Sequence, residues 1–136
     1  YISENSVYLK VLNYFNATLV KKNEKDYVLL DRVILEGLAE HAVCERWSKK
    51  YNANWTTLYS EEELRKWWEN HILPWIYLQN RHLRFRDLLY GMYGYPNMIG
   101  YCVGYYLVKK YVEKYNVTSR QLLSLPSEKI AQVNEK

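Results

Sequence analysis

The segment of residues 28–47, VLLDRVILEGLAEHAVCERW, constrains the fold of this chain more than any other. In a helical conformation its apolar side chains cover most of the circumference; they are Leu29, Leu30, Val33, Ile34, Leu35, Leu38, Ala39, Ala42 and Val43. A helix that is apolar nearly all round is a buried one. We therefore predict a central helix here, with the rest of the chain packed around it.

Two carboxylates interrupt this apolar segment. Glu36 and Glu40 are four residues apart and share one face of the predicted helix. Ionised carboxylates on a buried helix are costly unless they are paired or bind a cation. Two interpretations stay open: the face lines a functional cleft with Glu36, Glu40 and His41, or Glu40 and His41 reach solvent or a nearby arginine while a tyrosine hydroxyl satisfies Glu36.

The other structural signals are also helical. Amphipathic stripes predict helices over residues 7–20 and 97–115, and capping boxes at Ser60–Glu63 and Thr118–Gln121 predict helices over 64–72 and 118–123. A last helix is predicted with Pro126 in its first turn. No segment alternates as a strand would, so the visible chain is mainly α. We expect residues 1–136 to form a single domain, because hydrophobic residues make up 49% of a chain of this length and suffice for one core.

Charge and cysteine content bear on partners and compartment. A net charge of +4 with scattered basic residues indicates no nucleic-acid partner, and the basic cluster at residues 81–86 is interpreted as a solvated helix face. No apolar run is long enough to insert into a membrane. Cys44 and Cys102 lie in helical segments outside any CxxC pair, which favours reduced thiols and a cytoplasmic location.

Three blocks of the chain resemble one family in order and spacing. They are VLLDRVILEGLAEHAVCERW, WTTLYSEEELRKWW, and the stretch from LLYGMYGYPNMIGYCVGYY to LPSEKI. Together they resemble the bacterial predicted Zn-dependent protease family of unknown function, the YjaZ type, over about residues 8–131.

The resemblance implies a fold and a site. Family members are similar to gluzincin metallopeptidases, in which an HExxH helix supplies two histidines to Zn²⁺ and a glutamate to activate water. It implies a zincin-like helical core whose N-terminal sheet portion is absent from this chain, and it makes Glu36 the third zinc ligand. Tyr101 and Tyr105 are the candidates for steadying an oxyanion in the cleft.

The HExxH motif itself is missing. The best register places it on Leu12, Asn13 and Asn16, and no other register restores it because the first histidine of the chain is His41. Leucine has no lone pair, and an asparagine amide neither acts as a general base nor competes with imidazole for zinc. We therefore expect Glu36 to be hydrogen-bonded to Asn13, Asn16 or a tyrosine, or to carry a raised pKa.

These observations predict a member of the family that has lost its catalytic motif. We expect no bound cofactor, or zinc if the family chemistry survives, and a peptide or protein as the partner. The alternative is a metal-dependent peptidase or hydrolase that uses Glu36 with ligands the sequence does not reveal. The sequence leaves the oligomeric state open.

Overall fold

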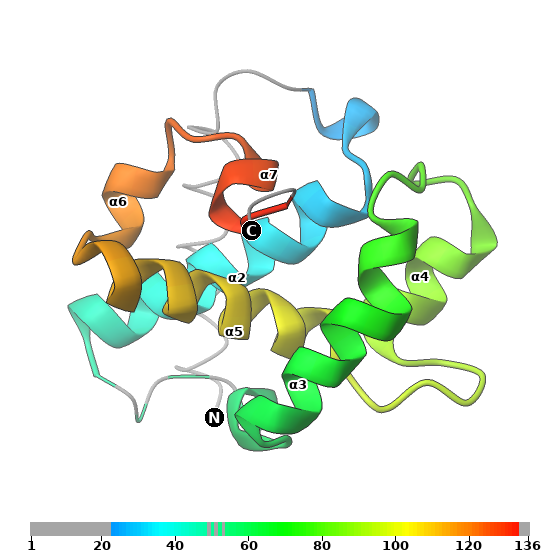
Figure 1. Ribbon diagram of the computed structural model, residues 1–136, viewed down its shortest axis with the longest axis horizontal. Coiled ribbons are helices and arrows are strands. Elements are labelled where there is room, and N and C mark those ends of the chain that lie inside the picture. Colours follow the sequence, from blue (N-terminus) through cyan, green and yellow to red (C-terminus); the bar gives the residue numbers. More distant parts are fainter. Residues whose placement is uncertain (1–22, 49, 51, 53, 134–136) are drawn as a thin grey trace.

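The computed structural model describes residues 23–48, 50, 52 and 54–133, and this part of the chain is mainly helical (Figure 1). The α-helices are α2 (Leu29–Arg46), α3 (Glu61–Trp67), α4 (Leu83–Tyr90), α5 (Ile99–Tyr115), α6 (Ser119–Leu122) and α7 (Ser127–Ile130). Short 3₁₀ turns span Glu24–Asp26, Asn54–Thr57 and Leu73–Trp75, and a π-helical turn spans Trp68–Ile72. The mainly α class is confirmed, while the helix predicted over residues 7–20 lies outside the described residues.

Helix α2 is the central helix, as its composition predicts. Leu29, Val33, Leu38, Ala39 and Val43 are fully buried. The backbone N–H groups of its first two residues donate to the carbonyls of Leu78 and Ile76, at 2.9 and 3.0 Å. The segment after α3 therefore caps α2 with main-chain groups, which satisfies donors that a helix start leaves open.

Helices α2 and α5 form the main contact of the fold, and α5 lies in front of α2 in Figure 1. Two glycines allow this approach. A Cβ at Gly37 would overlap the backbone carbonyl of Gly104, and a Cβ at Gly104 would overlap the carbonyl oxygen of Val33. The two backbones are therefore in direct contact, and the face of α2 beside Gly37 is sealed from water.

The remaining helices cover the ends of this pair. Helices α3 and α4 pack against α5, and α6 and α7 pack against α2 (Figure 1). Gly91 ends α4 in the left-handed conformation, with φ of 75°, and its N–H donates to the Asp87 carbonyl. The capping boxes Ser60–Glu63 and Thr118–Gln121, both predicted from sequence, begin α3 and α6.

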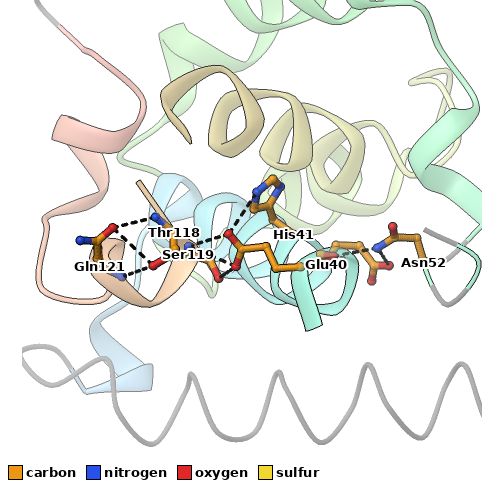
Figure 2. A network of polar contacts seen from close by, with 7 residues as sticks. Glu40, His41, Asn52, Thr118, Ser119 and Gln121 are labelled. Carbon is orange, nitrogen blue, oxygen red and sulfur yellow. Dashed lines mark hydrogen bonds and ion pairs between the residues drawn. The ribbon is translucent and has the colours of Figure 1, made fainter. Parts of the chain in front are cut away.

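A polar network joins the end of α2 to α6 (Figure 2). The Glu45 carboxylate accepts hydrogen bonds from the backbone N–H of Ser119, at 3.2 Å, and from its hydroxyl, at 2.5 Å. His41 Nε2 lies 3.6 Å from Glu45 Oε2. Burial lowers the pKa of His41. The negative charges of Glu45 and Glu113 act on the same imidazole to raise this pKa, and the positive charge of Lys109 lowers it.

Both cysteines are free thiols, with Cys102 buried and Cys44 half-buried, as predicted. The Cys102 thiol donates to the carbonyl of Trp55 at 3.0 Å. Burial raises its pKa to about 12.

Within the described ranges, no helix combines the length and apolar content that crossing a bilayer requires.

Replacing Gly104 with alanine tests the backbone contact between α2 and α5. Because alanine favours a helix over glycine by about 1 kcal/mol, local propensity alone predicts stabilisation. We expect instead a net loss of about 2 kcal/mol, since the added methyl group overlaps the Val33 carbonyl. Urea unfolding measures the sign, and Lys110→Ala on the exposed side of α5 is the control, expected to stay within about 0.5 kcal/mol.

His41 is expected to make the protein less stable in acid. Because its pKa is lowered from 6.5, the unfolded chain takes up this proton before the folded one as pH falls below that value. His41→Gln should therefore lose less free energy of unfolding than the wild type between about pH 7 and pH 5. The same substitution at the exposed His71 is the comparison, and equal losses in the wild type and His41→Gln would contradict the expectation.

Candidate functional site

The candidate site is centred on Glu36, which α2 carries at its crossing with α5. The side chain is fully buried, directly before the glycine that contacts α5. Tyr101 of α5 lies close enough to influence the carboxylate. The Tyr101 ring packs against Tyr90 of α4 at 5.5 Å and meets Trp55 edge-on at 5.4 Å, so aromatic rings from three segments enclose this position.

Arg32 is the charged partner of Glu36. It lies four residues earlier on the same helix, and its Nε and Nη2 atoms donate to Glu36 Oε2 at 3.0 and 2.8 Å. The arginine side chain is 27% exposed, whereas that of Glu36 is 0% exposed. The guanidinium thus reaches inward from the surface to a carboxylate that water cannot reach.

Burial, hydrogen bonding and charge act on the Glu36 carboxyl in opposite directions. Burial raises its pKa to about 8, the Tyr101 hydroxyl lowers it, and the charge of Glu40 raises it. The Arg32 guanidinium opposes burial, because a cation at 2.8 Å favours the ionised carboxylate. Both arginine N–H groups point at one oxygen of the carboxylate, which is the geometry of an ion pair with its ionised form.

The second carboxylate of this face is satisfied differently. Glu40 is also fully buried, and the Asn52 side-chain amide donates to its Oε1 at 3.0 Å and to its backbone carbonyl at 2.7 Å (Figure 2). The interpretation in which Glu40 reaches solvent is therefore wrong. Asn52, which follows α2 in the chain, thus lies against this helix.

The other residues predicted to line the cleft, Tyr101, Tyr105 and His41, do not all lie beside Glu36. Tyr101 lies beside Glu36, and burial raises its pKa, so it remains a neutral phenol. Tyr105, one turn further along α5, lies beside Cys44 and His41 instead; the Tyr105 and His41 rings are 6.2 Å apart. Burial raises the pKa of Tyr105 to about 12. The structure thus pairs Tyr101 with Glu36, whereas His41 joins the Glu45 network.

The described residues do not fit a zinc ion. A catalytic zinc needs three protein ligands, and no group of three His, Cys, Asp or Glu residues in the described part of the chain could hold a metal. The Oε2 atom of Glu36 already accepts two hydrogen bonds from a cationic side chain. Leu12, Asn13 and Asn16, the positions assigned to HExxH, lie outside the described residues.

Two residues of the site were not anticipated from the sequence. The expected partners of Glu36 were Asn13, Asn16 or a tyrosine, and Arg32 was not among them. Its spacing of four residues from Glu36 was the available signal, because i and i+4 side chains meet on a helix. Asn52 carried no comparable signal, since its approach to Glu40 depends on the path of the connection after α2.

Comparisons with known proteins identify the family of this chain. The family model described as "Predicted Zn-dependent protease (DUF2268)" matches residues 15–132. The uncharacterised protein YjaZ of Bacillus subtilis (strain 168) is 42% identical over 107 residues, which are 79% of this chain and 41% of YjaZ. The chain thus spans less than half the length of this curated relative, and no solved structure matches it significantly.

The family model extends over most of the chain and includes the helices that carry Glu36 and Tyr101. The name of the family implies zinc dependence, although the relative itself has no assigned function. On this evidence the chain belongs to the family described as predicted Zn-dependent proteases.

Proposed function

We propose that this chain is a member of the family that has lost its zinc centre and acts as a non-catalytic domain that binds a peptide or another protein. The observation that carries the proposal is the missing ligand set. The sequence contains no HExxH, and the described residues contain no group of three metal ligands. One glutamate does not hold zinc, so Glu36 would be the remnant of a third ligand.

A surface pocket supports the binding role. Residues 73–78 and Val133 line a pocket of about 500 Å³. Trp75 and Tyr77 in its wall are 38% and 58% exposed, and the Arg84 guanidinium lies 4.5 Å from the centre of the Trp75 ring. Exposed aromatic rings beside an arginine are typical of the side chains that carry binding energy at interfaces.

Charge favours one kind of peptide at this pocket. The Arg84 guanidinium lies over the Trp75 ring, and none of the described residues that line the pocket is acidic. An acidic peptide with an apolar side chain would place that side chain against Trp75 and its carboxylates near Arg84. The proposed ligand is therefore acidic and partly apolar.

We further propose that residues 1–136 form one domain and that the protein is cytoplasmic. The contact between α2 and α5, on which α3, α4, α6 and α7 all pack, supports a single core. The two free thiols support a reducing compartment. The alternative function is a metal-dependent hydrolase in which Glu36 works with groups outside the described residues or beyond this chain.

Metal content separates the two functions. We expect purified protein to contain far less than one zinc per chain by elemental analysis, and to cleave no peptide substrate before or after zinc is added. The HExxH positions offer no imidazole, so Glu36→Gln should leave metal content unchanged. Stoichiometric zinc that disappears in Glu36→Gln would establish the hydrolase alternative instead.

Peptides selected from a displayed random library test the binding role. We expect the selected sequences to be acidic with an apolar residue, and Trp75→Ala to weaken their binding about tenfold. Tyr93→Ala is the matched control, because Tyr93 is an aromatic residue that is 87% exposed and does not line the pocket. Peptides that bind Trp75→Ala and wild type equally well would rule out this pocket as the site.

A further inference from the structure

We infer that Arg32 is a built-in cation that replaces the metal ion as the partner of Glu36, so that the α2–α5 core is stable without zinc. The inference rests on the proposed loss of the zinc centre and extends it to a named residue. Loss of the HExxH motif alone would leave the buried Glu36 carboxylate without a cation, and Arg32 supplies one.

The geometry supports a dedicated pair. Both N–H groups of Arg32 converge on the same oxygen, Oε2, at 2.8 and 3.0 Å, while the other oxygen, Oε1, is buried without a partner of hydrogen-bond geometry among the described residues. The Tyr101 hydroxyl nevertheless lies close enough to lower the pKa of the carboxyl. Within the described part of the chain, Arg32 is thus the ion-pair partner of this carboxylate.

The position of the Arg32–Glu36 pair explains its importance for the stability of the fold. Glu36 directly precedes the glycine at which the α2 and α5 backbones touch, and its side chain is fully buried. A buried carboxylate that has lost its cation is strongly destabilising. Arg32 provides the missing positive charge from the same helix, one turn away, and its partly exposed side chain avoids full desolvation of the guanidinium.

The same geometry sets arginine and metal in competition. A divalent cation at Oε2 would lie against the guanidinium, and the two positive charges would repel each other. The second carboxylate on this face does not relieve that repulsion, because the Asn52 amide already donates to Glu40 Oε1 at 3.0 Å. A metal at Oε2 of Glu36 and the ion pair with Arg32 therefore exclude one another.

A double-mutant cycle on urea unfolding tests the inference, using Arg32→Met, Glu36→Gln and the double variant in EDTA. Arg32→Met should lower the folding equilibrium constant about 100-fold or more, because it leaves the buried carboxylate unpaired. Adding Glu36→Gln should recover at least about tenfold of that loss, since the charge that needed a partner is gone. Arg32→Lys, which keeps the charge, should be more stable than Arg32→Met.

An exposed pair on α3 provides the matched control. Arg65 Nη2 lies 2.6 Å from Glu62 Oε1, with the two side chains 44% and 60% exposed. The cycle of Arg65→Met and Glu62→Gln should show a coupling below about fivefold, as expected of a solvated pair. The contrast between the two cycles isolates the effect of burial from that of residue type.

The double-mutant cycle can fail independently of the zinc analysis that tests the proposed function. Additive effects of Arg32→Met and Glu36→Gln, or a double variant no more stable than Arg32→Met, would overturn the role of Arg32 even in a protein free of zinc. If Arg32→Met is too unstable to fold, recovery of folding in the double variant supports the pair, and failure to recover counts against it. Stoichiometric zinc in the wild type would instead overturn the proposed function.

Discussion

The close contact between α2 and α5 is the constraint on which the rest of the structure depends. Gly37 and Gly104 bring the two backbones together, because a side chain at either position would overlap a carbonyl of the opposite helix. This contact places Tyr101 beside Glu36, and both Glu36 and Glu40 of α2 are fully buried. Two acidic side chains are thereby held away from water, and each must find a partner inside the protein.

The two buried carboxylates are paired with two different side chains. Arg32 approaches Glu36 along the same helix, and Asn52 approaches Glu40 from the connection that follows α2. Both partners come from this chain, and neither requires an added ion. A carboxylate that the family resemblance assigns to zinc is here hydrogen-bonded by a guanidinium.

Much of the fold could be predicted from the sequence. The apolar circumference of residues 28–47 predicted the central helix, and the Ser60 and Thr118 capping boxes predicted the starts of α3 and α6. The resemblance identified the family and singled out Glu36 and Tyr101, which the fold brings together. The expected hydrogen bonds from Asn13 and Asn16 to Glu36 involve positions outside the described residues and stay predictions.

The sequence by itself determined the helices, their caps and the position of the acidic face, because periodicity and capping are properties of residues a few positions apart. Only the tertiary structure decided the partners of that face. An arginine four residues from a glutamate pairs weakly on an exposed helix, and the complete burial of Glu36 is what makes the Arg32 pair a requirement. Asn52 reaches Glu40 for a similar reason, since a contact across the end of α2 depends on how the following segment folds back.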